Sequence, residues 1–330
     1  MTAVPTIDLT LAETSAAERL RLDTACRDHG FFLLKNHGID LQIDAMWRAS
    51  QAFFDLPMAA KRAVKRTQEK PLGYYDQELT ERKRDLKEVF DFMPEPNQEG
   101  SHKDGSKSEF NRWPEDQPEF KSALGEFTEA AGTLAQRTLA LVFQALATAN
   151  SATHPAADTH SLPTGQHRTS NIRLNYYPIS DPLTEEEQRE VTQLGDMALH
   201  PHTDPGILTL LIQDQVGGLQ TFAKSAGWID VPPATGTIVV NLGDAMQVWT
   251  NDEYVAASHR VLPMRGQARY STPYFYNPKG DTVLAPLPQL VASTPRYRSF
   301  TWKEFIQARV NDNYADLGAP DTQIAHYRVA

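Results

Sequence analysis

The sequence predicts a mixed α+β fold, mainly β, in which a helical N-terminal region precedes a sandwich or jelly roll. Short apolar stretches separated by turn residues recur between Asn171 and Tyr276, a spacing typical of such β folds. An apolar stripe of helical period runs from Pro118 to Asn150, which indicates a long helix whose apolar face needs a sheet or other helices to cover. Strand-like and helix-like patterns alternate in the first 60 residues.

The N-terminal elements follow from local signals. Ser15 and Glu18 have the spacing of a capping box, so a helix is expected to begin there and to end near Gly30. A second helix is expected at residues 41–54, and Pro57 is expected to end it. Strands are expected at residues 4–9 and 30–34. Residues 61–87 are expected to form a loop with a helical turn, and residues 95–113 the most exposed loop.

The C-terminal half carries nine strand candidates. They lie at residues 171–177, 198–202, 207–213, 219–223, 228–231, 237–242, 245–249, 258–262 and 269–276. A charged insertion at residues 184–194 interrupts them. Thr184 and Glu187 have the spacing of a capping box there, so we expect the insertion to be helical. A final helix is expected at residues 300–310.

These elements predict four segments along the chain. Residues 1–150 form the N-terminal region of strands and helices, and its long helix spans about 118–150. Residues 151–170 form a linker by composition, 171–285 form the jelly-roll core, and 286–330 form a C-terminal helical segment. No internal repeat or low-complexity segment divides the chain further.

Composition narrows the class of protein. The formal net charge is −10, which disfavours binding to nucleic acid phosphates. The single cysteine, Cys26, allows no intrachain disulfide and suits a reducing compartment. The N-terminus lacks the pattern of a signal peptide, and no run of about 18 apolar residues occurs. A cytoplasmic enzyme without a membrane span is therefore expected, as a monomer by default.

A candidate metal site stands out among the polar residues. His202 and Asp204 are two residues apart, and on a strand such residues point to the same face. His259 begins a later strand candidate and supplies a third ligand. Two imidazoles and one carboxylate form the ligand set of non-haem iron(II) oxygenases, which leaves coordination positions open. Each histidine taken alone is more often an ordinary polar residue at a strand end.

A candidate anion site follows the last of these residues. Arg269 and Ser271 share a strand face by the same period of two, and together they can bind a carboxylate through charge-assisted hydrogen bonds. Asn175 and Tyr177 are also two residues apart and can present an amide and a phenol to the same ligand. An exposed arginine and an aromatic core strand are the ordinary alternatives for these two segments.

Taken together, these segments resemble the isopenicillin N synthase-like family of iron(II)- and 2-oxoglutarate-dependent oxygenases. The matching segments follow one another in the family's order along nearly the whole chain. They are Pro5-Thr6-Ile7-Asp8, Gly30-Phe31-Phe32, Asn36-His37-Gly38, Lys87-Glu88-Val89-Phe90-Asp91-Phe92, Leu174-Asn175-Tyr176-Tyr177-Pro178, His202-Thr203-Asp204, Gly217-Gly218-Leu219-Gln220, Asn241-Leu242-Gly243-Asp244, Ser258-His259-Arg260-Val261 and Arg269-Tyr270-Ser271.

The resemblance implies a distorted double-stranded β-helix, or jelly roll. It implies Fe(II) held by His202, Asp204 and His259, with O2 and the co-substrate 2-oxoglutarate bound at the metal. The far carboxylate of 2-oxoglutarate would meet Arg269 and Ser271, with Tyr177 and Asn175 as supporting contacts. A small-molecule substrate would be hydroxylated or desaturated, with release of succinate and CO2. Substrate-facing candidates are Tyr75, Arg84, Phe90 and Phe275.

The sequence departs from the family pattern in two places. The stretch between Pro178 and His202 is longer than usual, and its helical insertion is either a lid or a surface feature. Pro71 stands where isopenicillin N synthase has an arginine for the remote carboxylate of its substrate, which argues against that tripeptide. Two alternatives stay open: an iron oxidase independent of 2-oxoglutarate, and a non-catalytic jelly-roll binding protein.

Overall fold

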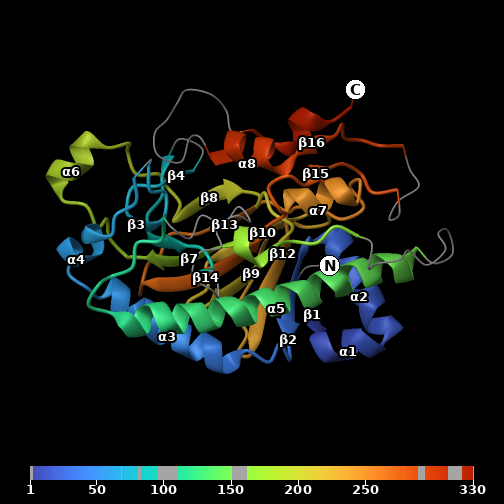
Figure 1. Ribbon diagram of the computed structural model, residues 1–330, viewed down its shortest axis with the longest axis horizontal. Helices are drawn as coiled ribbons and strands as arrows, with labels where there is room; N and C mark the ends of the chain where they lie inside the picture. Colours follow the sequence, from blue (N-terminus) through green and yellow to red (C-terminus); the bar gives the residue numbers. More distant parts are fainter. Residues whose placement is uncertain are drawn as a thin grey trace.

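Two β-sheets form the centre of the molecule (Figure 1). The large sheet has eight strands in the order β1 (Thr6–Asp8), β2 (Phe31–Lys35), β12 (Thr237–Leu242), β9 (Leu208–Gln213), β14 (Arg269–Tyr276), β7 (Asn171–Tyr177), β6 (Glu88–Phe92) and β3 (Gly73–Tyr75). The small sheet has four, in the order β11 (Gly227–Asp230), β10 (Leu219–Ala223), β13 (His259–Val261) and β8 (Leu199–His202). This pair of sheets is the jelly-roll core.

The computed structural model describes residues 3–67, 69–80, 83–95, 110–150, 162–288, 294–310 and 322–329. Most of the exposed loop expected at 95–113, and the first part of the linker expected at 151–170, lie outside these residues. Two further strand pairs join β4 (Leu79–Thr80) to β5 (Lys83–Arg84) and β15 (Val283–Leu284) to β16 (Phe300–Thr301). Within the described ranges, no helix is long and apolar enough to cross a membrane.

Helices cover the outer face of the large sheet. They are α1 (Leu9–Thr14), α2 (Ala16–Asp28), α3 (Asp40–Phe54) and the long α5 (Pro118–Ala149). In Figure 1, α5 runs across most of the molecule with α2 and α3 beside it. Its buried residues recur every three or four positions, among them Phe120, Leu124, Phe127 and Ala131, so one stripe of the helix packs on the sheet. The expected long supporting helix is therefore confirmed.

The remaining helices lie around the other sides of the sheets. They are α4 (Met58–Ala63), α6 (Glu185–Glu190), α7 (Asp244–Trp249) and α8 (Trp302–Val310), with short 3₁₀ turns at His167–Thr169 and Ile324–Tyr327. The insertion expected to be helical forms α6, and its Thr184 and Glu187 make the predicted capping box. In Figure 1, α7 and α8 lie across the sheets from α5.

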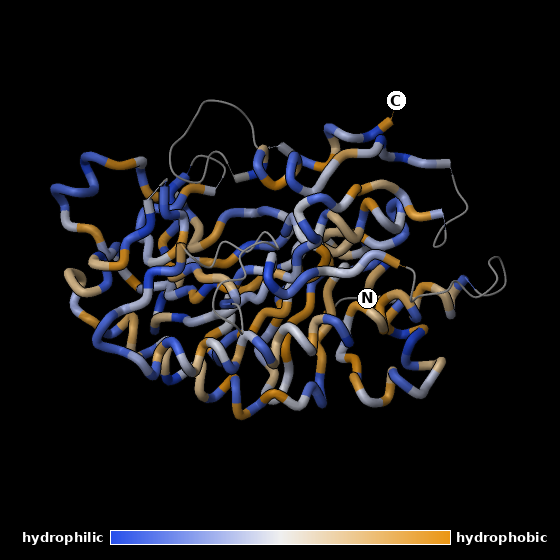
Figure 2. Tube along the Cα trace, viewed as in Figure 1, coloured by the Kyte–Doolittle hydropathy of each residue, from blue (hydrophilic) through white to orange (hydrophobic). Residues whose placement is uncertain are grey.

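Strand β2 shows how the sequence divides the core into two layers. Its side chains alternate, so Phe32 and Leu34 join the large cluster shared with the helices. Phe31 and Leu33 join a smaller cluster together with Leu219 and other residues of the small sheet. Both sets are buried, which explains why β2 reads as a continuous apolar run. Figure 2 shows the hydrophobic residues gathered along these inner strands.

Four predicted strands, at residues 171–177, 219–223, 237–242 and 269–276, have the predicted bounds. The strand predicted at 245–249 is wrong, since these residues belong to α7. The first N–H groups of α7 find partners outside the helix: Asp244 N donates to Asp204 O at 2.8 Å, and Ala245 N to Gly206 O at 3.1 Å. A helix can begin there because the loop that follows β8 accepts these otherwise unsatisfied donors.

Residues 61–87, which were expected to form a loop with a helical turn, are more regular than predicted. They contain the end of α4 and strands β3, β4 and β5, and β6 follows directly. Strand β6 pairs antiparallel with β7, with Asp91 opposite Arg173 and Val89 opposite Asn175. The N-terminal half therefore supplies strands at both ends of the large sheet.

Candidate active site

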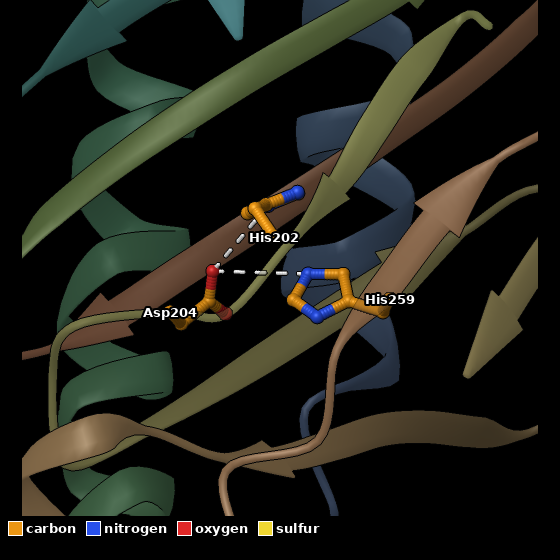
Figure 3. Close-up of side chains that lie close together, drawn as sticks. All are labelled: His202, Asp204 and His259. Atoms are coloured by element: carbon orange, nitrogen blue, oxygen red, sulfur yellow. Dashed lines mark ion pairs between the residues drawn. The ribbon is translucent and has the colours of Figure 1, made fainter. Parts of the chain in front are cut away.

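His202, Asp204 and His259 converge at one edge of the small sheet, as Figure 3 shows. His202 is the last residue of β8 and His259 the first of β13, and the two are directly paired across the strands. Their ring centroids are 4.3 Å apart. Nε2 of each histidine lies 3.8 Å from Oδ1 of Asp204. One potential ligand atom from each residue can be chosen so that all three lie within 4.8 Å of one another.

Asp204 does not continue the strand, in contrast to the prediction, because β8 ends at His202. Its carboxylate is fixed instead by the large sheet. Oδ2 accepts hydrogen bonds from Thr209 Oγ1 at 2.6 Å and from Asn241 Nδ2 at 2.7 Å. This leaves Oδ1 directed at the two imidazoles. Such outer hydrogen bonds orient metal-binding carboxylates.

The two imidazoles are oriented in a corresponding way. Nδ1 of His202 donates to the carbonyl of His200 at 2.9 Å, and Nδ1 of His259 lies 3.3 Å from the carbonyl of Ala257. Each contact directs an Nε2 lone pair toward the shared centre, as in histidine metal ligands. Burial, together with the neighbouring His259, lowers the pKa of His202 to about 3, so its imidazole is neutral near pH 7 and able to bind a cation.

The carboxylate of Asp204 is ionised. Burial acts to raise its pKa, but His259, His202 and the two hydrogen bonds to Oδ2 outweigh it and hold the pKa below its ordinary value. Two imidazole nitrogens and one carboxylate oxygen therefore face a single point. This donor set fits a divalent iron ion with positions left open.

A buried cation lies in the same cavity. Arg269 is 0% exposed and donates from Nη1 to Ser271 Oγ at 3.1 Å and from Nη2 to Gln213 Oε1 at 3.3 Å. Its guanidinium lies 5.0 Å from the ring centre of Tyr177. Among the described residues, no carboxylate forms an ion pair with it, and its buried Nε has no partner. A buried arginine in this state can bind an anion through charge-assisted hydrogen bonds.

The strand register brings the other two predicted anion contacts beside this arginine. Tyr177 is directly opposite Arg269, and Asn175 is opposite Ser271. Nδ2 of Asn175 donates to Ser271 Oγ at 3.4 Å. The four residues that the sequence selected for the anion site therefore lie together on the inner face of β7 and β14.

One cavity, of about 250 Å³, is lined by both the histidine–aspartate group and Arg269. It is also lined by residues that were not predicted from the sequence. Principal among them are Glu78, Lys87, Asn171, Arg173, Ile306 and Arg309. Asn171 and Arg173 could have been predicted from the sequence. They lie four and two residues before Asn175, so they share its face of the strand. Glu78 and Lys87 depend on how β6 and its neighbours pair with β7.

Of the four predicted substrate-facing residues, only Phe275 lines this cavity. Phe90 packs instead against Phe53 and Phe120 in the helix-covered core. Arg84 forms an ion pair with Asp181, and the ring of Tyr75 lies against Lys65 and Arg66.

A link to the C-terminal helix completes the site. Arg309 of α8 donates from Nη2 to the Thr203 carbonyl at 2.9 Å, and Thr203 Oγ1 donates to Asp244 Oδ2 at 3.3 Å. Burial raises the pKa of Asp244 to about 7, although Arg309 and Thr203 act to lower it. The residue between His202 and Asp204 is thus held from both α7 and α8.

Two models of known protein families match this chain, one in each half. The model of the 2OG-Fe(II) oxygenase superfamily matches residues 168–278. The model described as "non-haem dioxygenase in morphine synthesis N-terminal" matches residues 4–116. A gibberellin 3-beta-dioxygenase from Pisum sativum is 31% identical over 313 residues, which are 92% of this chain and 76% of that relative.

Solved structures agree with these matches. A full-length protein from Neurospora crassa, in complex with α-ketoglutarate (that is, 2-oxoglutarate) and 5-formyluracil, has a TM-score of 0.74 at 25% identity, over 93% of this chain and 95% of that one. JOX2 in complex with 2-oxoglutarate, iron and JA has a TM-score of 0.71 at 27% identity, over 93% and 84%. The family matches, the relatives and the fold agree, and the chain belongs to the 2-oxoglutarate- and iron(II)-dependent oxygenases of the isopenicillin N synthase-like group.

Proposed function

We propose that His202, Asp204 and His259 bind the iron(II) of this oxygenase and that Arg269 binds the far carboxylate of 2-oxoglutarate. One observation carries the proposal. A single cavity holds a group of two imidazoles and a carboxylate together with a buried arginine that has no carboxylate partner among the described residues. The first group suits the metal, and the second suits the co-substrate.

Each part of the chain has a defined task in this proposal. Three protein ligands leave three positions on iron, which when bound supplies the activation of O2. Ser271 adds a hydroxyl to the Arg269 receptor, Asn175 orients that hydroxyl, and Tyr177 packs against the guanidinium. The buried walls exclude water from the reacting groups. Phe275 and the other residues that line the cavity contact the substrate.

The reaction is hydroxylation or desaturation of a small molecule, with release of succinate and CO2. The size of the cavity and the small molecules bound by the Neurospora crassa protein and by JOX2 support a substrate of this kind. The net charge of −10 argues against a nucleic acid substrate. The single buried cysteine is in keeping with a cytoplasmic location, and we propose a monomer.

The test measures binding and turnover separately. Under anaerobic conditions, iron(II) is expected to bind with a stoichiometry of one, and 2-oxoglutarate then adds a weak visible charge-transfer band. With O2 and a metabolite library, the substrate increases the formation of succinate. Turnover of a substrate without 2-oxoglutarate would favour an iron oxidase. Iron binding without oxygen consumption, whatever substrate is added, would favour a binding protein.

A further inference from the structure

The cations that line the cavity differ in how their charges are compensated. Arg269 has no carboxylate partner within the part of the chain that the structure describes. Lys87 and Arg173, by contrast, belong to a largely buried cluster of three cations, Arg66, Lys87 and Arg173, and three anions, Glu78, Asp85 and Asp91. We name these six residues the Glu78 cluster. Its formal charge is zero, because three positive groups balance three negative ones.

Glu78 is the centre of this cluster. Its Oε2 lies 2.7 Å from Lys87 Nζ and 2.6 Å from Arg173 Nη1, and its Oε1 lies 2.9 Å from Arg66 Nη2. Arg173, Lys87 and Arg66 hold the pKa of Glu78 well below its ordinary value, although burial acts to raise it. Lys87 also lies 2.9 Å from Asp85, which accepts a hydrogen bond from His200 as well.

A substrate carboxylate would therefore meet a compensated surface at the Glu78 cluster. It would bring an additional negative charge into a buried region whose cations already have partners, and burying an uncompensated charge is costly. Arg309, a further cation of the lining, is also engaged. It donates to the carbonyls of Thr203 and Thr322 and lies near the buried Asp244.

The cluster does leave hydrogen-bond donors. Lys87 has three N–H groups and uses two of them, for Glu78 and Asp85. Arg173 has five, and four are taken by Glu78 and Asp91. The Asn171 oxygen accepts from Asn277 at 3.1 Å, while its amide nitrogen has no acceptor among the residues described. The carboxylate of Glu78 is fully used, so the Glu78 cluster offers chiefly donors to the cavity.

The shape of the cavity limits the size of the substrate. Phe275 is directly opposite Asn171 in the pairing of β14 with β7, so an aromatic face and an amide donor lie on adjacent strands. Leu79 and Ile306 add apolar walls. The volume of about 250 Å³ also has to hold 2-oxoglutarate, and pockets for drug-sized ligands are usually about 300–1,000 Å³. A small substrate fits this space.

We infer that the substrate is a small neutral molecule whose carbonyl oxygens accept hydrogen bonds from Lys87, Arg173 and Asn171, as in a cyclic amide or imide, and that it is not a carboxylate. This inference rests on the proposed function, since it assigns the metal to His202, Asp204 and His259 and 2-oxoglutarate to Arg269 in the same cavity. The apolar face of Phe275 packs on the ring. Charge neutrality of the Glu78 cluster is thus the determinant of substrate class.

Pairs of compounds that differ only in charge test the inference. Neutral amides and imides, such as 4-methylbenzamide and thymine, are compared with acids of equal size, such as 4-methylbenzoate. Binding to the anaerobic complex with iron(II) and 2-oxoglutarate is measured by calorimetry, and turnover by succinate. The neutral members are expected to bind at least tenfold more tightly. Equal or tighter binding of the acids, or no binding of any neutral member, would overturn the inference.

A substitution of Glu78 tests whether the charge of the cluster causes the preference for neutral compounds. Glu78→Gln leaves the cluster with one excess positive charge, so the ratio of acid to amide affinity is expected to rise at least tenfold. Glu88→Gln is the matched control, because Glu88 is a buried β6 carboxylate paired with Lys61 and does not line the cavity. An unchanged ratio in folded Glu78→Gln would contradict the inference.

A second variant covers the case in which Glu78→Gln does not fold. Asn171→Ala removes one donor without changing any charge, and it is expected to weaken binding of the neutral compounds about fivefold, the effect of one hydrogen bond of about 1 kcal/mol. Unchanged binding would count against the inference. The affinity for 2-oxoglutarate reports separately on the proposed function: if it is absent in the unmodified protein, that function fails first.

Discussion

Arg309 of the C-terminal helix α8 donates a hydrogen bond of 2.9 Å to the backbone carbonyl of Thr203, the residue between His202 and Asp204. The same nitrogen lies 3.3 Å from Thr203 Oγ1, which in turn donates to Asp244. A residue more than 100 positions away in the sequence thus holds the loop that carries the candidate aspartate ligand. The helix therefore contributes to the geometry of the candidate metal site and to the wall of the cavity.

Replacing this arginine is expected to loosen the loop. Arg309→Met should weaken iron(II) binding about tenfold, because a charged hydrogen bond contributes about 1.5 kcal/mol. Arg309→Lys keeps the charge but not the planar guanidinium, so partial recovery is expected. Equilibrium dialysis with iron(II) measures the effect. The exposed Arg296→Met serves as the control, and equal affinities in the two methionine variants would exclude the role.

Metal binding is expected to stabilise the fold through the paired strands β8 and β13. A divalent ion at 100 times its Kd adds about 2.7 kcal/mol to the free energy of unfolding, so iron(II), or cobalt(II) as a substitute, should raise the Tm. His259→Ala should abolish the shift, whereas the exposed His326→Ala should keep it. A full shift in His259→Ala would remove this residue from the ligand set.

Substitutions of Arg269 and Ser271 are expected to weaken 2-oxoglutarate binding to different extents. Arg269→Ala should raise the 2-oxoglutarate concentration needed for half-maximal turnover roughly 10- to 100-fold, because charged hydrogen bonds contribute about 1.5–3 kcal/mol. Ser271→Ala removes a neutral hydroxyl, and about a fivefold increase is expected. Both constants come from succinate formation. An Arg269→Ala enzyme with the unmodified requirement would refute the assignment.

The insertion helix α6 is expected to lose its anchor in acid. Glu187 accepts hydrogen bonds from Thr184 and lies 2.5 Å from Arg62 of α4, and these contacts lower its pKa to about 2. Its folded pKa is below its ordinary value. The contribution to stability is therefore complete above about pH 4.5 and is lost as the pH falls toward 2.

Amide hydrogen exchange in α6 measures this dependence. Protection should fall between pH 5 and pH 2 in the unmodified protein, after correction for the intrinsic exchange rate. Glu187→Gln should reduce protection already at neutral pH and flatten the profile, while Glu186→Gln on the same helix should not. Identical profiles for the two variants would mean that the pair with Arg62 does not hold the helix.

Much of the fold was predictable because local patterns and tertiary structure agree. The alternation in β7 and β14 and the helical stripe of α5 mark elements that bury one face each. The segment Ala245–Trp249 shows the limit of such patterns. A short apolar run fits a buried strand or a buried helix equally well. Its helical form depends on the carbonyls of the loop after β8, which are far away in the sequence.

Part of the candidate site could likewise be predicted from the sequence, and part of it could not. His202, His259, Arg269 and Ser271 were selected because their residue types and spacing suit the chemistry, and the strand pairing brings them into one cavity. The Glu78 cluster was missed because its ion pairs join residues 66–91 to Arg173 across β6 and β7, a pairing that no local pattern indicates. Phe90 was chosen within that same strand, but its ring lies on the helix side.

The order of strands in the large sheet limits how this enzyme can be recombined with its relatives. β2 lies beside β12 and β6 beside β7, so the two halves of the chain are joined by two pairs of hydrogen-bonded strands. Lys87 comes from one half and Arg173 from the other, yet both line one cavity. In a chimera joined near residue 150, the strands from the two parents would have to pair correctly at both places. Each parent would then supply some of the residues that line the cavity. Substrate range is expected to transfer only when β6 and β7 move together.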